Sequence, residues 1–153
     1  MVHVFRAFLI LDLFRTSHDD PNISMTSSYL DLAPLYGSTQ DEQDTVRSFK
    51  DGKLKPDCFN ESRLGAFPPG VGALLICFNR FHNYVVEQLA MINEGGRFSL
   101  PTRAAIERQV RLKAKGTETE IQAQIDDAYQ KALVKQENDL FQVGRLYLLS
   151  RMC

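Results

Sequence analysis

The stretch of residues 71–93 constrains the fold more than any other part of the chain. Apolar side chains recur there at spacings of three and four residues, which places them on one side of an α-helix. Residues 68–70 (Pro-Pro-Gly) precede the stretch and residues 95–96 (Gly-Gly) follow it. Such residues are typical of helix boundaries, because proline suits the first turn and glycine suits the position after the last. The side chains that we expect in a hydrophobic core are Leu74, Phe78, Phe81, Val85, Leu89 and Ile92.

The remaining patterns are also helical, and no stretch of useful length alternates as a β-strand does. The sequence therefore predicts an all-α fold with long loops, such as the polar stretch 16–28, and with little or no strand. Residues 103–139 are rich in charged residues, and we expect them to form an exposed helical insertion. The other expected helices are 2–15, a short one from a capping box at 38–41 to residue 49, 101–115, 118–135 and 140–149.

The two outermost expected helices look incomplete. No capping residue precedes residues 2–15, and the apolar helix 140–149 is followed only by Ser-Arg-Met-Cys. Helices of globular proteins usually carry recognisable start and stop signals. We therefore expect residues 1–153 to be a fragment of a single larger all-α domain.

The composition of the chain argues against nucleic-acid binding and against a transmembrane segment. The chain has 153 residues, 44% of them hydrophobic, and its net charge of −1 gives no electrostatic reason to bind nucleic acid. The longest apolar run, residues 71–78, is too short for a transmembrane segment. The N-terminus lacks the small-residue cleavage site of a signal peptide. Three sparse cysteines suit a reducing compartment, so we expect an intracellular, cytoplasmic protein.

Six segments of the chain carry a resemblance to a known family. They include Tyr-Leu-Asp-Leu-Ala-Pro-Leu-Tyr-Gly and Phe-Asn-Arg-Phe-His-Asn-Tyr-Val. In this order they resemble the haem peroxidase superfamily that includes cyclooxygenase. Within it they are most similar to fungal fatty-acid dioxygenases of the linoleate diol synthase and psi-factor-producing oxygenase type. They correspond to the N-terminal part of the family's catalytic domain only. The segments are residues 13–18, 26–37, 49–54, 67–70, 78–85 and 139–146.

The resemblance implies a haem b enzyme that oxygenates linoleic or oleic acid to hydroperoxides in oxylipin biosynthesis. In that family the proximal His and a radical-forming Tyr share a Tyr-x-x-His motif, which does not occur in these 153 residues. The position of the distal His falls on Leu11, which cannot accept a proton. We therefore expect no stable haem binding and no catalysis by this chain. The alternative is a non-catalytic remnant or a helical interaction fragment. Intact relatives are expected to be homo-oligomers.

The same resemblance places a Ca²⁺ site beside the haem pocket. Its ligands here would be Asp12, Ser27, the backbone carbonyl of Tyr29, and Asp31. These groups offer the oxygen atoms that Ca²⁺ prefers. Ala33 departs from the family pattern, in which a hydroxyl is usual, and Asp31 has the alternative of capping a turn or pairing with an arginine.

Three further positions have competing interpretations. Arg63 matches an arginine that lies over the haem in related peroxidases, or it is an exposed surface arginine. His18 is expected in a solvated loop, and His82 is expected to make an interhelical hydrogen bond and not to bind iron. A nearby aromatic stripe is expected to pack in the core, with a fatty-acid channel as the alternative. It consists of Phe78, Phe81 and Tyr84.

Overall fold

The computed structural model of the chain describes residues 17, 19–20, 22–25, 32–66, 69–113 and 117–152. Within these ranges the secondary structure is helical and contains no β-strand, and Arg47 forms an isolated bridge with Leu54. The prediction of an all-α fold is confirmed, while the expected helix 2–15 lies outside the described residues. The elements are α2 (Ala33–Tyr36), α3 (Gln40–Val46), the 3-10 helix η1 (Ser62–Ala66), α4 (Pro69–Ile92), the 3-10 helix η2 (Glu94–Gly96), α5 (Arg103–Lys113) and α6 (Glu118–Met152).

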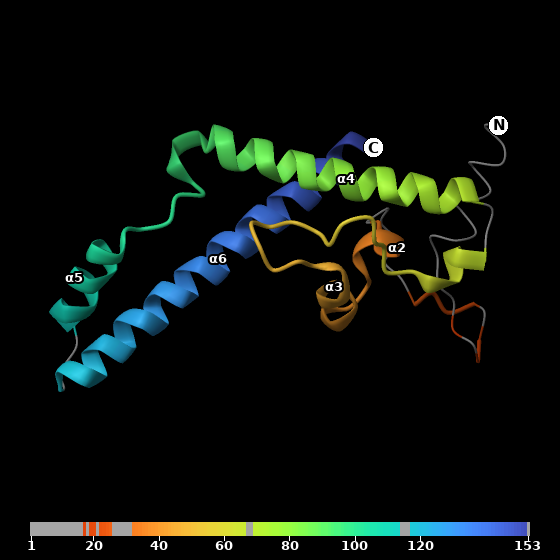
Figure 1. Ribbon diagram of the computed structural model, residues 1–153. Coiled ribbons are helices and arrows are strands. Elements are labelled where there is room, and N and C mark those ends of the chain that lie inside the picture. The colour runs from red at the N-terminus through yellow and green to blue at the C-terminus, as the bar shows by residue number, and fades with distance from the viewer. Residues whose placement is uncertain are drawn as a thin grey trace.

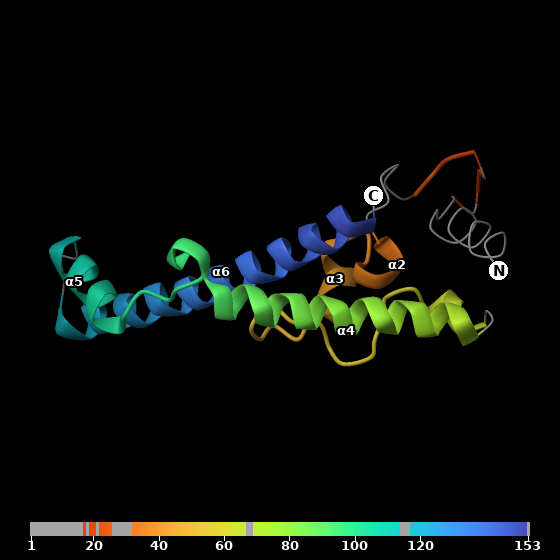
Figure 2. The ribbon, with the colours of Figure 1, turned by 90° about the horizontal axis from the view of Figure 1, so that it is seen from above.

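Two long helices organise the structure. Figure 1 shows α4 crossing the C-terminal half of α6, with α2 and α3 beside the crossing and α5 against the other end of α6. The same arrangement is visible from above in Figure 2. The main hydrophobic core lies where α2, α4 and α6 meet, and it buries Leu35, Tyr36, Leu75, Phe141 and Leu148. Each such large apolar side chain stabilises the fold by about 1.5–3 kcal/mol when it is fully buried.

The predicted helix at 71–93 is confirmed, with observed bounds of Pro69–Ile92. Its C-terminal signal differs from the expected Gly-Gly pair, because the backbone reverses at Asn93, whose φ of 40° is left-handed. The Asn93 side chain accepts a hydrogen bond from the Phe98 backbone N–H (2.8 Å) and donates one to Ser99 Oγ (2.8 Å). Asparagine tolerates this conformation better than most residues. No helix in the described ranges is long and apolar enough to span a lipid bilayer.

The capping box before α3 is real but begins one residue later than predicted. Thr39 Oγ1 accepts a hydrogen bond from the Glu42 backbone N–H (3.3 Å), and Glu42 Oε2 accepts one from the Ser38 backbone N–H (2.8 Å). The box therefore runs from Thr39 to Glu42, which matches the usual Thr-x-x-Glu spacing. The helix ends at Val46 and does not reach residue 49.

The prediction of two separate helices at 118–135 and 140–149 was wrong, because α6 is continuous from Glu118 to Met152. The polar residues between the two expected helices contain neither proline nor glycine, so nothing in the backbone interrupts the helix. Their side chains are instead held by other parts of the chain. Gln136 donates to the Phe98 carbonyl, and Glu137 and Asn138 bind Arg47.

The buried face of α4 also differs from the predicted one. Leu75, Asn79, His82, Val85 and Val86 are buried. By contrast, Phe81, Tyr84 and Ile92 are 39%, 55% and 70% exposed, so the expectation that they pack in the core is wrong for this chain. The helix is rotated relative to the expectation because Asn79 and His82 find buried hydrogen-bond partners in the segment 52–58.

The two long helices approach closely at Gly144. A Cβ atom at this position would lie 2.5 Å from Val86 Cγ2 and 3.2 Å from His82 Cε1. Real Cβ atoms do not come so close to another carbon, so a larger residue would force α4 and α6 apart. Glycine is otherwise a poor residue for the interior of a helix, and its use here follows from this contact.

We expect Gly144→Ala to lower the free energy of unfolding by about 1–3 kcal/mol, because overpacking forces neighbouring side chains or the backbone to shift. Gly72→Ala is the matched control within α4, since its Cβ would meet nothing closer than 3.9 Å. That control should raise the free energy of unfolding by up to about 1 kcal/mol through helix propensity. Urea unfolding followed by circular dichroism measures the free energy of unfolding of both variants. Equal values for Gly144→Ala and Gly72→Ala would contradict the close crossing.

Candidate functional site

Most of the predicted site residues fall in parts of the chain that the structure does not describe. Leu11, Asp12, Ser27, Tyr29 and Asp31 all lie outside the described residues, as does His18. Their assignments to a haem pocket and to a Ca²⁺ site therefore stay predictions. Arg63 and His82 lie within the described ranges, and their surroundings can be stated.

Arg63 lies in η1 and forms a two-pronged ion pair with Glu61. Its Nε and Nη2 donate to Glu61 Oε1 and Oε2 over 2.8 and 2.9 Å. The Arg63 side chain is 55% exposed, while the Glu61 side chain is only 7% exposed. The arginine therefore neutralises a nearly buried carboxylate at the surface, which is a structural task. Its placement over a haem is an expectation that no observed contact tests.

A buried polar arrangement among the described residues centres on His82. The ring is fully buried, and its Nδ1 lies 2.9 Å from the Tyr36 hydroxyl oxygen, while its Nε2 lies 3.0 Å from the Gly52 carbonyl oxygen. A carbonyl oxygen can only accept, so Nε2 carries the proton and Nδ1 accepts from the Tyr36 O–H. This bond joins α2 to α4, which confirms the expected interhelical role of His82.

Apolar surroundings keep both groups of this pair neutral. The Phe141 ring lies 5.4 Å from the His82 ring and 5.9 Å from the Tyr36 ring, measured between centroids. Burial lowers the pKa of His82 to about 4, the Gly52 hydrogen bond opposes this shift, and the charge of Arg47 adds to it. Burial also raises the pKa of Tyr36 well above its ordinary value, against a smaller opposite effect of Arg145.

The turn that supplies the Gly52 carbonyl is held against α6. Gly52 has a φ of 69°, and a Cβ there would lie 2.7 Å from Leu140 Cβ. Only glycine fits this left-handed, crowded position without strain. The predicted turn at residues 51–52 is confirmed, and its close approach to α6 is what brings its carbonyl to His82.

Two asparagines extend the same polar face of α4. Asn83 bonds both backbone groups of Leu54, accepting from its N–H over 2.8 Å and donating to its carbonyl over 3.2 Å. Asn79 donates to the carbonyls of Lys55 (2.9 Å) and Cys58 (3.0 Å). These side-chain amides bind backbone groups of the segment 54–58 that a neighbouring β-strand would bind in a sheet. Sequence reasoning named His82 and Asn83 but missed Asn79, although polar residues at positions 79, 82 and 83 share one face of an otherwise apolar helix.

Arg47 is a second buried anchor that sequence reasoning missed. Its guanidinium carbon lies 5.1 Å from the Phe49 ring centroid and 4.2 Å from that of Phe141. Its Nη2 donates to Glu137, and its Nη1 donates to Asn138 Oδ1 over 3.2 Å. The Arg47 and Glu137 side chains are 5% and 12% exposed. No pattern in the sequence links residues so far apart, so this contact had no local signal.

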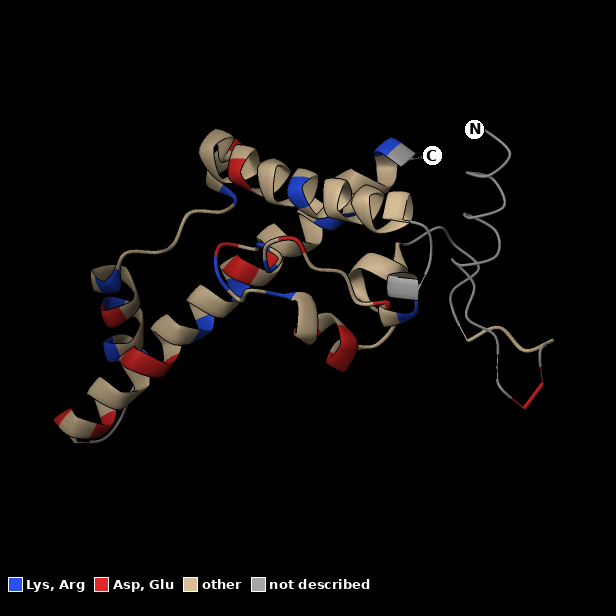
Figure 3. Cartoon of the chain, turned by 45° about the vertical axis from the view of Figure 1, so that its right-hand side comes forward, with Lys and Arg blue, Asp and Glu red and all other residues tan. Residues whose placement is uncertain are grey.

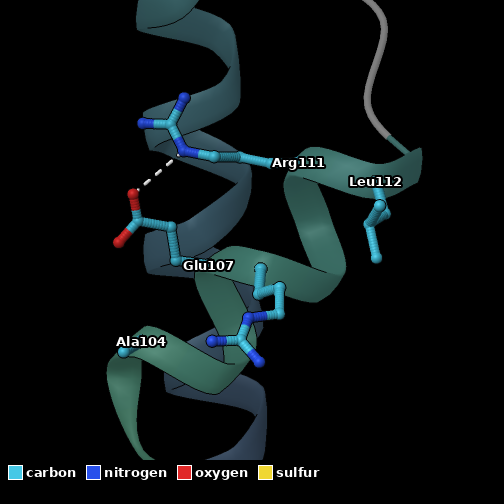
Figure 4. A pocket seen from close by; sticks show the side chains of 5 residues that line it. Ala104, Glu107, Arg111 and Leu112 are labelled. Atoms are coloured by element: carbon cyan, nitrogen blue, oxygen red, sulfur yellow. Dashed lines mark hydrogen bonds and ion pairs between the residues drawn. The ribbon is translucent and has the colours of Figure 1, made fainter.

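The described residues of the charged part of the chain form several surface ion pairs. Figure 3 shows basic and acidic residues interspersed along α5 and the first half of α6. Figure 4 shows a shallow hollow on α5 in which Arg111 donates to Glu107 over 2.9 Å. Arg111 also pairs with Glu118, and these two carboxylates raise its pKa. The hollow is lined by Ala104, Glu107, Arg108, Arg111 and Leu112.

Comparison with known proteins gives several related fungal enzymes. Psi-producing oxygenase A of Aspergillus fumigatus is 56% identical over 140 residues, which is 92% of this chain and 11% of that protein. The 7,8-linoleate diol synthase of Pyricularia oryzae is 50% identical over 142 residues, 93% of this chain and 10% of that protein. The linoleate diol synthase of Gaeumannomyces graminis is 62% identical over 102 residues, 67% of this chain and 9% of that protein.

The chain belongs to the family of fungal fatty-acid dioxygenases. It spans about 11% of the length of the psi-producing oxygenases it matches. No protein-family model matches the chain, and no solved structure matches it.

His82 of this dioxygenase segment does not fit the role of a haem ligand. It is the only histidine among the described residues, and both of its ring nitrogens are already engaged in buried hydrogen bonds. Coordination of haem iron by His82 would require a free imidazole nitrogen, and freeing one would leave a buried polar group without a partner. The described ranges also contain no group of three His, Cys, Asp or Glu side chains that could hold a metal ion.

The stability of the segment should fall as the pH drops from about 6.5 toward 4. The pKa of His82 is about 4 in the folded chain against an ordinary value of 6.5, so the unfolded chain binds more protons in this window. The loss should approach about 1.4 kcal/mol per pH unit, and roughly 3 kcal/mol in total. Urea unfolding between pH 6.5 and 5, above most carboxylate titrations, measures it. His82→Gln should remove this component of the slope, and an unchanged slope would contradict it.

Arg47 and Glu137 should be strongly coupled. Arg47→Met leaves a nearly buried carboxylate unpaired and should cost about 3–5 kcal/mol of stability. Adding Glu137→Gln should recover part of this loss, which gives a coupling energy of about 1–3 kcal/mol in a double-mutant cycle. The exposed pair Lys131–Asp127 is the control, with an expected coupling of up to about 0.5 kcal/mol. Additive effects at Arg47 and Glu137 would show that their contact is not formed.

Proposed function

We propose that this chain is a structural segment of a dioxygenase polypeptide that oxygenates an unsaturated fatty acid of the linoleate class to a hydroperoxide, as part of oxylipin biosynthesis. The observation that carries the proposal is the 53–56% identity to psi-producing oxygenase A proteins over 92% of the chain. The names of other relatives, linoleate diol synthase and linoleate 10R-lipoxygenase, identify the same substrate class.

Within such a polypeptide, the described residues act as a scaffold. Their buried polar groups hold backbone: His82 binds the Gly52 carbonyl, and Asn79 and Asn83 bind the segment 54–58. His82 and Asn83 use both polar atoms of their side chains in hydrogen bonds, so neither offers a free functional group. A segment of this kind positions reacting groups that are carried elsewhere, and we expect no fatty-acid turnover by the 153-residue chain alone.

The cofactor assignments remain part of the proposal. A haem would supply the oxidation chemistry of the whole enzyme, with Leu11 at the position of the distal His and Arg63 near the porphyrin. Asp12, Ser27 and Asp31, together with the Tyr29 carbonyl, would contribute oxygen ligands to Ca²⁺. Support for these roles comes from the family relationship alone.

A chimera tests the proposed function. Residues 1–153 of this chain replace their counterpart in psi-producing oxygenase A of Aspergillus fumigatus, and hydroperoxides formed from linoleate are measured by liquid chromatography and mass spectrometry. We expect a folded chimera with low activity, since Leu11 cannot transfer a proton. Leu11→His should raise the rate by about 10²–10⁴, the usual contribution of a general acid–base group.

Leu9→His in the same chimera is the matched control, because it adds the same side chain two residues away. It should leave the rate unchanged. A folded chimera that forms no linoleate hydroperoxide with either histidine would contradict the proposal that this segment can serve in a fatty-acid dioxygenase.

A further inference from the structure

The outward face of α4 is apolar and uncovered in the described part of the chain. Phe81, Tyr84 and Met91 are 39%, 55% and 69% exposed. They follow one another at helical spacing on the side opposite the buried Asn79 and His82. We call this face the outer stripe, and it consists of the exposed Ala73, Cys77, Phe81, Tyr84 and Met91 together with the uncharged, half-buried Gln88.

The charges of α4 lie beside the outer stripe and not on it. From Pro69 to Ile92 the only charged residues of the helix are Arg80 and Glu87, since His82 is neutral. Arg80 pairs with Asp57 and Glu87 pairs with Lys53, so both turn toward the segment 53–57. The stripe itself is free of charge. One side of α4 is already buried, so an uncharged, largely apolar stripe on its opposite side is typical of a helix covered by a second layer in a larger protein.

We infer that the outer stripe is the contact surface for an apolar layer contributed by the rest of the same dioxygenase polypeptide. This inference rests on the proposed function. The remainder of such a polypeptide is a source for the layer, because the chain matches only about 11% of psi-producing oxygenase A. The absence of charge from the stripe favours such a permanent contact over a transient partner, whose surfaces are as polar as the protein exterior.

The thiol of Cys77 reports directly on this surface. Cys77 belongs to the stripe and is exposed in the described structure. We compare its rate of alkylation by a maleimide in the isolated 153-residue chain with its rate in the chimera described above, scoring the Cys77 peptide by mass spectrometry. The rate should fall at least about tenfold in the chimera, since a covered thiol reacts only when the structure opens locally. Unfolding the chimera in urea should restore the rate.

A charge placed on the stripe provides a second test. Tyr84→Asp should lower the melting temperature of the chimera while leaving that of the isolated chain unchanged, because only the chimera has an apolar layer over this position. Leu112→Asp is the matched control, since Leu112 is 80% exposed on α5 and outside the stripe. Leu112→Asp should leave the melting temperatures of both the chimera and the isolated chain unchanged.

Two results would overturn the inference. One is equal reactivity of Cys77 in the isolated chain and in the folded chimera. The other is a dimer of the isolated chain, seen by light scattering, that protects Cys77 and is lost on Tyr84→Asp, which would assign the stripe to a second copy. The inference and the proposed function can fail separately. A Leu11→His chimera that forms no hydroperoxide but protects Cys77 refutes only the function, and an active Leu11→His chimera with an open Cys77 refutes only the contact.

Discussion

The structure depends on the close crossing of α4 and α6 at Gly144. Because this position has no side chain, the His82 ring can lie directly against α6 with Val86 beside it. That ring then reaches two segments at once, the Tyr36 hydroxyl in α2 and the Gly52 carbonyl in the following turn. A single contact between helices therefore determines where α2 and the segment 52–58 are placed. Arg47 reinforces the same region by linking the end of α3 to Glu137 of α6.

In the proposed function, this segment has a supporting part in an oxygenase. His82 is buried, neutral and fully hydrogen-bonded, which suits a structural residue and leaves no nitrogen for iron. The predicted Ca²⁺ loop ends just before Leu32 and α2, and Tyr36 at the end of α2 is held by His82. The crossing thus anchors the chain a few residues beyond the predicted metal ligands. In an enzyme of this family, such an anchor would hold the loop in place.

Local patterns in the sequence were enough to predict the helical class, the bounds of α4 within two residues, the turn at residues 51–52 and the hydrogen-bonding role of His82. They failed where partners lie far away along the chain. The continuity of α6 depends in part on Arg47 holding Glu137 and Asn138, and the rotation of α4 depends on the segment 52–58 binding Asn79. The exposure of Phe81 and Tyr84 could not be predicted from their spacing. Apolar residues recur at the same helical spacing whether they pack against this segment or against another part of a larger protein.

The central claim is that His82 is a neutral structural residue whose Nε2 carries the proton. Long-range ¹H–¹⁵N correlation spectra of the imidazole ring at pH 7 test it most directly, because they distinguish the two neutral tautomers from the imidazolium ion. We expect the tautomer with the proton on Nε2. We also expect Tyr36→Phe to change the ¹⁵N chemical shift of Nδ1 while Nε2 stays protonated. A proton on Nδ1, or a charged ring at this pH, would contradict the central claim.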